Sequence, residues 1–351
     1  MKAAVVEGIA KPLVVHNDWP DPDCGPDEAV IRVEANGICR SDYHVWQGGW
    51  PWLGIALQPP FVLGHEYCGV VEEVGAAVTR VSKGDRVVVP FNHSCGRCEP
   101  CQAGHQNVCS DLRLPMANYT GGFGRLTKVS RADVNVVALP ESISYVDAAA
   151  LGCRFMTAWH GVVDQASVQA GEWVAVFGCG GVGLAAVDIC TALGANVIAV
   201  SRTAEKLKLA KELGAVHTVN ASDGKSAEQV TELTRGGAHV SIDALGDADT
   251  AIPAVLSLRA RGRHLRLGTS SKKQGGTIPL PVDLFVFREL QFVGSFGMQA
   301  ARYPEMLRMV ESGKLHPGKM VRSTVPIEHA SDVLASMTSY GTVGMEVITQ
   351  W

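Results

Sequence analysis

Two short segments bring together side chains that suit metal-assisted proton chemistry. Residues 37–44 contain Cys39, Ser41 and His44, and a second segment reads Gly64-His65-Glu66. A zinc ion with an open coordination position needs about three protein ligands of thiolate, imidazole or carboxylate type. Ser41 and His44 add a hydroxyl and a titratable ring, which can carry a proton away from an alcohol at the metal. Taken singly, Cys39 could equally be a buried core thiol and His65 a hydrogen-bonded loop histidine.

A cysteine-rich stretch gives the strongest local signal. Its spacing is Cys95-x2-Cys98-x2-Cys101-x7-Cys109. Four thiolates this close predict a tetrahedral zinc site, in which every position is filled and the metal stabilises a loop. An iron–sulfur cluster is the alternative metal interpretation.

A glycine-rich turn predicts a dinucleotide site. The apolar run 172–177 leads into Gly178-Cys179-Gly180-Gly181-Val182-Gly183, and a helical pattern continues to Leu193. In such a strand–turn–helix unit, the first glycine permits the turn, the second admits a pyrophosphate and the third lets the helix pack on the strand. The helix N-terminus then offers its N–H groups to the phosphates. The alternative is an ordinary glycine-rich βα turn.

The second strand of this unit, residues 196–200, ends without the acidic residue that is typical of NAD-binding folds. Ser201 and Arg202 stand there instead, and Lys206 follows. A hydroxyl and a guanidinium can hold a 2′-phosphate, so the sequence favours NADP(H) over NAD(H). Otherwise, Arg202 stacks on the adenine of NAD or points into solvent. Gly268, which follows a strand-like run near residues 264–267, is a further predicted cofactor residue.

Three tryptophans lie in one loop rich in glycine and proline: Trp46, Trp50 and Trp52. An aromatic loop beside a metal suits the wall of an apolar substrate pocket. The alternative is that the indoles anchor the loop to the core.

Bulk properties restrict the class of protein. The chain has 351 residues, long enough for two domains, and its net charge of -4 gives no reason to expect nucleic acid or an anionic membrane as a partner. No apolar run is long enough to span a bilayer, and the N-terminus lacks a signal-peptide pattern. We therefore expect a cytoplasmic protein, in which thiols stay reduced. Its ten cysteines then suggest metal binding rather than disulfide bonds.

The periodicity changes along the chain. Alternation over residues 29–34, 61–71 and 78–89, separated by glycine turns, predicts a β-barrel-like domain. From about residue 150, strands and helices alternate, which predicts a doubly wound parallel sheet. After about residue 290 the pattern is mixed, with a helix over 327–337 and a strand over 345–349.

In these motifs and their order, the chain resembles a zinc-dependent alcohol dehydrogenase of the medium-chain dehydrogenase/reductase superfamily. The resemblance covers essentially the whole length and rests on five patterns: residues 39–44, residues 64–66, the four cysteines, Leu151-Gly152-Cys153 and the 178–183 turn. It implies a GroES-like β-barrel catalytic domain at 1–152 and 290–351, and a Rossmann domain at 153–289.

The resemblance also implies roles for single residues. Cys39, His65 and Cys153 would hold a catalytic zinc, with Glu66 as an occasional ligand. The four cysteines would hold a structural zinc. Ser41 would accept the alcohol proton, His44 would relay it and Asp42 would orient His65, while Arg40 would contact the cofactor pyrophosphate and Thr157 would lie near the nicotinamide. One departure is Gly344-Met345, because close family members often carry Gly-Arg at that place.

These features predict an NAD(P)-dependent zinc enzyme that interconverts primary or secondary alcohols with aldehydes or ketones. The expected assembly is a homotetramer or homodimer, with residues 295–298 as a contact segment. A polyol dehydrogenase of the same fold is the nearest alternative, although three tryptophans suggest a less polar pocket. An inactive nucleotide- or zinc-binding protein is a second alternative, but it would not need Ser41 and His44. A nucleic-acid-binding zinc ribbon is a third, and the negative net charge of the chain argues against it.

Overall fold

The computed structural model describes residues 1–339 and 341–351. The chain divides into two compact units. The first unit comprises Met1–Met156, Gly297–Gly313 and Pro317–Trp351, and the second unit comprises Thr157–Phe296 and Lys314–His316. The domain borders expected from the sequence, after residues 152 and 289, stay a prediction.

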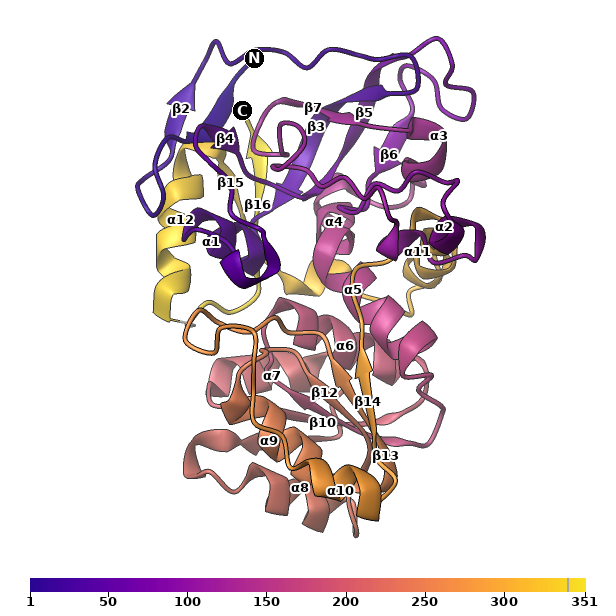
Figure 1. The fold of residues 1–351 in the computed structure, drawn as a ribbon, viewed down its shortest axis with the longest axis vertical. Coiled ribbons are helices and arrows are strands. Elements are labelled where there is room, and N and C mark those ends of the chain that lie inside the picture. Colours follow the sequence, from indigo (N-terminus) through magenta and orange to yellow (C-terminus); the bar gives the residue numbers. More distant parts are fainter. Residues whose placement is uncertain (340) are drawn as a thin grey trace. The chain divides into compact units, whose positions relative to one another are not determined.

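The first unit is built on two sheets. The larger has the order β15-β16-β3-β5-β6-β8, with β7 paired to β3, and the smaller has the order β2-β1-β4 (Figure 1). Register shifts between β3 and β5 mark bulges, which bend paired strands. The strands of the first unit are β1 Ala3–Val6, β2 Val14–His16, β3 Ala29–Gly37, β4 Phe61–Val62, β5 Glu66–Val74, β6 Arg86–Val88, β7 Leu126–Val129, β8 Val137–Ala138, β15 Val321–Pro326 and β16 Met345–Gln350.

Short helices complete the first unit: α1 Arg40–Trp46, α2 Glu99–Gln102, α3 Ala132–Asn135, α4 Tyr145–Ala150, α11 Tyr303–Glu311 and α12 Ala330–Ser336. After α4 the helical path continues through the π-helical segment Leu151–Phe155, α5 Met156–Trp159 and a second π-helical segment, His160–Gln165. The widened turns thus fall where the chain passes from the first unit to the second.

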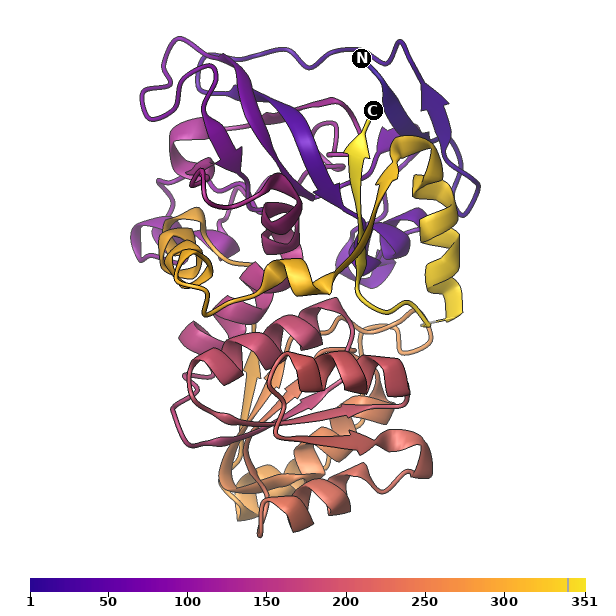
Figure 2. The same cartoon turned by 180° about the vertical axis from the view of Figure 1, so that it is seen from behind.

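The second unit is a doubly wound parallel sheet, as the sequence predicts. Its order is β11-β10-β9-β12-β13-β14, and every neighbouring pair is parallel. Figures 1 and 2 show α6 and α7 on one face of this sheet and α8 and α9 on the other. The elements are β9 Trp173–Phe177, α6 Gly181–Ala192, β10 Asn196–Ser201, α7 Ala204–Glu212, β11 His217–Asn220, α8 Ser226–Leu233, β12 Ala238–Asp243, α9 Ala248–Leu256, β13 Leu258–Arg266, α10 Val282–Phe287 and β14 Gln291–Gly294.

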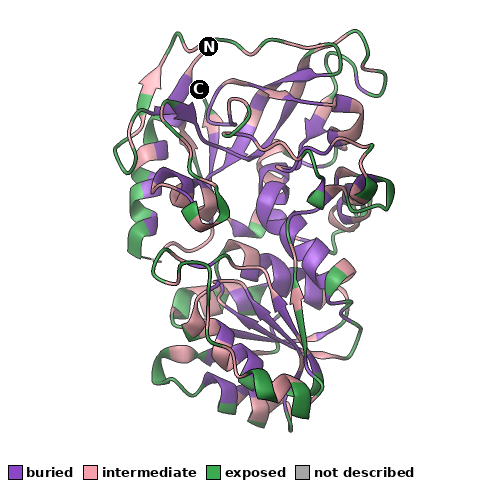
Figure 3. Ribbon diagram, viewed as in Figure 1, coloured by how far each residue is buried: buried purple, intermediate pink, exposed green. Residues whose placement is uncertain are grey.

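Each unit has its own apolar core. Strands β9, β10 and β12 in the second unit are almost entirely buried because helices cover both faces (Figure 3). In the first unit, inward residues of β3 and β5 such as Ile31, Val33 and Val71 form one cluster, and β1 packs with α1 and α12 in another.

One expected strand is mostly absent. Residues 78–85 are irregular, with a bend at Arg80 and a turn at Lys83 and Gly84, and within the stretch 78–89 only Arg86–Val88 pairs as a strand, β6. The reason is a side chain from far along the sequence: the carboxylate of Asp133 accepts the backbone N–H of Thr79 at 3.0 Å and that of Arg80 at 2.8 Å. Those N–H groups are then unavailable to a sheet ladder. The prediction of β structure over the whole stretch was therefore wrong.

Within the described part of the chain, none of the helices combines the length and the apolar character that crossing a bilayer demands.

Candidate active site

Helix α1 positions the first group of predicted residues. Cys39 is its N-cap, and Asp42 closes a capping box by accepting the backbone N–H of Cys39 at 2.8 Å. The other carboxylate oxygen of Asp42 accepts the backbone N–H of Gly64 at 3.0 Å and the Nδ1–H of His65 at 3.0 Å. Asp42 has no exposed surface. One buried carboxylate therefore fixes the segments that carry Cys39 and His65 relative to each other.

Four potential metal ligands converge in the first unit: Cys39, His65, Glu66 and Cys153. All four are buried, and their ligand atoms lie within 4.8 Å of one another. Cys153 comes from the π-helical segment Leu151–Phe155, and such widened turns are frequent at functional sites. We call these residues the catalytic cluster.

Hydrogen bonding in the catalytic cluster fits a metal. Because Asp42 engages Nδ1 of His65, the lone pair on Nε2 is left for another partner. Nε2 of His65 and both carboxylate oxygens of Glu66 are buried with no aligned hydrogen bond from the described residues, although Oε2 of Glu66 forms an ion pair with Nη1 of Arg154 at 3.1 Å. Leaving such atoms unsatisfied costs about 1–3 kcal/mol each. Two sulfurs, one imidazole nitrogen and a carboxylate are a donor set that Zn²⁺ accepts.

The electrostatics of the catalytic cluster favour a cation. A hydrogen bond from Cys153 is the main cause that holds the pKa of the Cys39 thiol well below its usual range. Burial opposes a charge on His65, yet Asp42 and Cys39 raise its pKa well above the usual value. Burial raises the pKa of Glu66 to about 8, although Arg154 works against that rise. The thiolate of Cys39 and the ring of His65 thus attract a positive charge between them. A metal ion can take the place of the proton there.

The predicted proton-relay residues lie on the same helix. Ser41 and His44 are three residues apart in α1, which puts them on one face, and both are half-buried, whereas Asp42 between them is buried. The His44 ring lies 5.3 Å from the ring of Trp50. Helix α1 thus turns Asp42 toward the catalytic cluster and leaves a hydroxyl and an imidazole with access to solvent.

The four cysteines of the stretch 95–109, here called the cysteine lobe, also converge. Their sulfurs lie within 4.8 Å of one another, with Cys98 Sγ 3.4 Å from Cys101 Sγ and 3.7 Å from Cys109 Sγ. Backbone N–H groups point at the sulfurs, as in the contact from Cys98 to Cys95 Sγ at 3.3 Å. Such contacts from the N–H groups of Ser110 and Cys101 lower the pKa of Cys98 to about 6. The geometry suits a closed tetrahedral thiolate site.

The glycine-rich turn of the second unit has the expected form. It joins β9 to α6, with Gly178 at φ +94° and Gly180 as the N-cap of the helix. Gly181 and Val182 begin α6. A Cβ on Gly183 would lie only 1.8 Å from the carbonyl oxygen of Gly178, so no larger residue fits this close approach of helix and strand.

The other predicted cofactor residues are placed as follows. Ser201 ends β10, and its hydroxyl accepts the Thr203 backbone N–H at 3.4 Å. Arg202 is exposed and Lys206 is half-buried in α7. Gly268 follows β13, and a Cβ there would lie 2.3 Å from the carbonyl carbon of Leu245.

Two further predicted cofactor residues lie elsewhere. Thr157, the first residue of the second unit, is buried. In the first unit, the guanidinium of Arg40 contacts the carbonyl oxygen of Met337 and lies 4.6 Å from the ring centre of Tyr43. Their assignments to the cofactor stay predictions.

The three tryptophans are not equivalent. Trp46 and Trp50 are buried in the core cluster that contains β1, and Trp52 packs against that cluster. The Nε1–H of Trp46 donates to the carbonyl oxygen of Lys11 at 2.6 Å. Trp46 therefore has the contacts of an anchor, and the assignment of all three to a substrate pocket stays a prediction.

Comparison with known proteins gives the family. The alcohol dehydrogenase GroES-like domain family matches residues 25–141, and the zinc-binding dehydrogenase family matches residues 181–312. An alcohol dehydrogenase of Geobacillus stearothermophilus is 33% identical over 338 residues, with 96% of each chain covered. The chain belongs to the zinc-type alcohol dehydrogenases of the medium-chain dehydrogenase/reductase family. The fold prediction of a GroES-like domain with a Rossmann domain is thereby confirmed.

Two more members of the family are similar to this chain over almost its whole length. A sorbitol dehydrogenase of Bacillus subtilis (strain 168) is 32% identical over 338 residues, which is 95% of this chain and 92% of the relative. A crystal structure from Sinorhizobium meliloti 1021, assigned as a zinc-binding dehydrogenase and bound to NADP, superposes with a TM-score of 0.88 at 32% identity and covers 99% of this chain and 98% of that one. The chain is accordingly an oxidoreductase of the alcohol dehydrogenase type.

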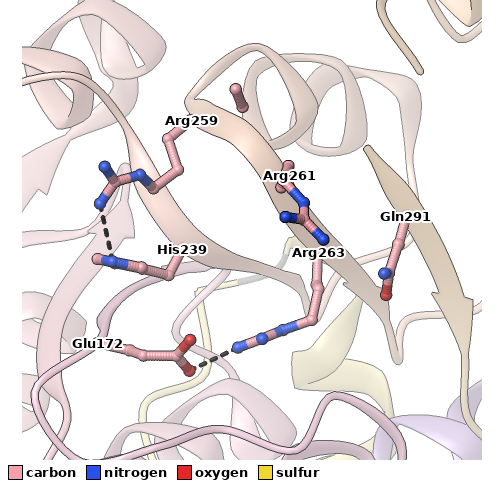
Figure 4. A pocket seen from close by; sticks show the side chains of 7 residues that line it. Glu172, His239, Arg259, Arg261, Arg263 and Gln291 are labelled. Atoms are coloured by element: carbon pink, nitrogen blue, oxygen red, sulfur yellow. Dashed lines mark hydrogen bonds and ion pairs between the residues drawn. The ribbon is translucent and has the colours of Figure 1, made fainter. Parts of the chain in front are cut away.

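A surface cavity in the second unit lies away from the glycine-rich turn. It has a volume of about 350 Å³ and is lined by Glu172, His239, Arg259, Ala260, Arg261, Arg263 and Gln291. Figure 4 shows the 2.5 Å ion pair between Arg263 and Glu172 within it. Several of these residues stand at the amino ends of β9, β12 and β14. Ligands of open α/β sheets bind outside the carboxyl ends of the strands, so this cavity is not the candidate cofactor site.

Sequence reasoning missed several residues around both sites. The ring of Phe91 meets the His65 ring edge-on, with centroids 5.8 Å apart, and an aromatic residue three positions after the end of β6 was the available signal. In the second unit, Asp243 at the end of β12 accepts the backbone N–H groups of Leu245 and Gly246 at 3.1 and 2.9 Å, and Arg266 pairs with it at 2.7 Å. This pair holds the loop against which Gly268 packs.

Proposed function

We propose that this enzyme interconverts primary or secondary alcohols and the corresponding aldehydes or ketones, with apolar or aromatic substrates favoured. The observation that carries the proposal is the catalytic cluster, in which Cys39, His65, Glu66 and Cys153 bring their ligand atoms within 4.8 Å of one another in a buried site. These four residues could hold a zinc ion, which when bound would supply a Lewis acid for the substrate oxygen, and the second unit could hold a nicotinamide cofactor, which would supply or accept the hydride.

The protein residues have distinct tasks in this proposal. Cys39, His65 and Cys153 hold the metal, and Asp42 orients His65 through Nδ1. The hydroxyl of Ser41 would take the proton of the alcohol while it gives its own proton to the relay that ends at His44, which releases a proton to solvent. The partial exposure of Ser41 and His44 supports this path. A second zinc in the cysteine lobe has a structural task, because four thiolates leave no position for substrate.

For the cofactor, we propose a preference for NADP(H), with NAD(H) as a weaker partner. The residues at the end of β10 support this preference. Ser201 supplies a hydroxyl and the exposed Arg202 supplies a guanidinium, where an NAD-binding fold would typically carry an acidic residue. The related Sinorhizobium structure was solved with NADP. An acid at this place would repel a 2′-phosphate, whereas Arg202 can pair with it.

We expect Arg202→Asp to raise the Michaelis constant for NADP by roughly 30-fold, because a charge-assisted hydrogen bond is worth about 2 kcal/mol. The constant for NAD should change by less than about 3-fold. Steady-state kinetics with both cofactors measures this, and Lys208→Asp on the exposed side of the neighbouring α7 is the matched control. Equal increases for NADP and NAD would remove Arg202 from the 2′-phosphate site.

A screen of alcohols and aldehydes with NAD(H) and NADP(H) in parallel, followed by absorbance of the reduced nicotinamide, tests the function directly. The proposal predicts turnover of apolar or aromatic alcohols. The sorbitol dehydrogenase among the relatives makes a polyol dehydrogenase the second candidate. Preferential oxidation of polyols in the screen would select that candidate, and no oxidation of any alcohol would reject both.

We also propose a homo-oligomer, a dimer or a tetramer, that is joined through the edge of the second unit. Strand β14 is the last strand of the sheet, and among the strands that the structure describes it pairs with β13 alone. Beside it, α10 exposes Val282, Val286 and Phe287, and Phe287 is 85% exposed. An unpaired edge next to exposed apolar side chains is typical of a surface that another chain covers. A two-fold axis would pair two copies of β14, close to the predicted contact segment 295–298.

We expect Phe287→Asp to weaken this association by at least about 10-fold in dissociation constant, because an interface core tolerates a buried charge poorly. Sedimentation velocity over a range of protein concentrations measures the change. Val216→Asp, at a 41% exposed position of the same unit, is the control. An unchanged sedimentation coefficient for Phe287→Asp would move the interface elsewhere.

A further inference from the structure

Arg154 is a buried cation that the reaction above does not use. It follows Cys153 in the π-helical segment Leu151–Phe155 and is only 4% exposed. Placing a guanidinium in a core is costly unless other groups satisfy it. The partners of Arg154 therefore indicate why it is there.

The partners of Arg154 among the described residues belong to the catalytic cluster or adjoin it. Its Nη2 donates to the carbonyl oxygen of Ile38, the residue before Cys39. Its Nη1 lies 3.1 Å from Oε2 of Glu66 and 2.7 Å from the sulfur of Met345. Although burial opposes its charge, Glu66 and Cys39 raise the pKa of Arg154 above its ordinary value. Arg154 is thus a fixed positive charge beside the metal ligands.

The carboxylate of Glu66 lies between Arg154 and the other potential ligands of the catalytic cluster. It is fully buried, and a Cβ on Gly37 would lie 2.4 Å from its Oε2 and 2.5 Å from the terminal methyl carbon of Met345. No described residue donates an aligned hydrogen bond to either oxygen of Glu66. The carboxylate therefore has two attractive positions, beside Arg154 or among the sulfur and nitrogen ligands of the catalytic cluster.

These two positions have different chemical consequences. A zinc ion with two thiolates and one imidazole keeps a vacancy, and a coordinated carboxylate would fill it. Zn²⁺, two thiolates and the Glu66 carboxylate carry one net negative charge, which the guanidinium of Arg154 cancels. The sulfur of Met345 accepts a hydrogen bond from the same Nη1 at 2.7 Å. Because a thioether is neutral, Glu66 stays the anionic partner of Nη1.

We propose that Arg154 is a positioning residue that holds Glu66 off the catalytic metal and so reserves the fourth coordination position for the substrate oxygen. This inference rests on the proposed zinc function of the catalytic cluster. It adds a role for a residue that binds neither metal nor substrate and that acts through Glu66.

The test replaces the catalytic zinc by Co²⁺, whose visible absorption reports the number and type of ligands without turnover. Arg154→Met removes the charge and keeps much of the volume. We expect a changed cobalt spectrum, an approximately 10-fold slower release of the metal to a chelator and a higher Michaelis constant for alcohol, because Glu66 then joins the metal. Arg154→Lys should restore the spectrum at least in part.

The double variant Arg154→Met/Glu66→Gln separates this role from a general packing role. An amide is a poor zinc ligand, so the double variant should regain the original cobalt spectrum and release rate. Arg125→Met is the control, because Arg125 also combines a carbonyl contact with an ion pair in the first unit but lies away from the catalytic cluster. It should leave the spectrum unchanged.

Two results would overturn the inference. One is an unchanged cobalt spectrum in Arg154→Met, and the other is an altered cobalt spectrum that persists in the double variant Arg154→Met/Glu66→Gln. If Arg154→Met does not fold, Glu66→Gln alone decides. With Glu66 already held off the metal, that variant should keep the wild-type spectrum, and a changed spectrum would contradict the proposal. Failure of the wild-type catalytic cluster to bind Co²⁺ at all would instead reject the underlying zinc function.

Discussion

Replacement of Cys39 by alanine is expected to lower kcat/KM by at least about 10³-fold, because the loss of one ligand removes several kcal/mol of transition-state stabilisation by the metal. The buried thiol supplies one of the donor atoms that lie within 4.8 Å of one another, and Asp42 fixes its backbone. No described residue of the same chemistry is placed to substitute for it. Metal analysis should show one zinc ion per chain fewer than in the wild type.

Cofactor affinity should survive in Cys39→Ala, because the glycine-rich turn lies in the second unit, whose core is separate. Isothermal titration with NADP measures this. Cys190→Ala is the control, since Cys190 is buried in α6 and belongs to neither cysteine-containing cluster. A Cys39→Ala enzyme that kept a rate near that of the wild type would refute the assignment of Cys39 as a ligand.

The second large effect is expected in the cysteine lobe. Cys101→Ser should lower the first thermal transition by roughly 6–12 °C, because structural zinc contributes folding free energy directly and a loss of about 3 kcal/mol shifts a unit of this size by that amount. Cys101 is buried in α2, and its sulfur lies 3.4 Å from that of Cys98 and 4.0 Å from that of Cys95. Calorimetry together with zinc analysis measures both consequences.

Cys24→Ser is the matched control for this experiment. Cys24 is half-buried in the first unit and stands outside both clusters, so its replacement should keep both zinc ions and shift the transition by less than about 2 °C. If Cys101→Ser kept two zinc ions and the wild-type transition temperature, the cysteine lobe would not be a structural metal site.

Features that depend on neighbours in the chain were predictable from the sequence. The cysteine lobe spans residues 95–109, and the turn 178–183 follows its strand directly, so the short connecting chain limits where the side chains can lie. The parallel sheet of the second unit followed from alternating strand and helix patterns. The convergence of Cys39, His65 and Cys153 was predictable only through the family resemblance, because no local spacing joins them.

The tertiary structure alone decided the surroundings of those residues. Periodicity did not indicate that Asp133 would take the N–H groups of residues 79 and 80, or that Trp46 would face the core. It also did not place Arg154 between Glu66 and Met345, which come from distant parts of the chain. Spacing along a chain constrains only nearby side chains, whereas the partners of a buried charge are chosen when remote segments pack and leave water.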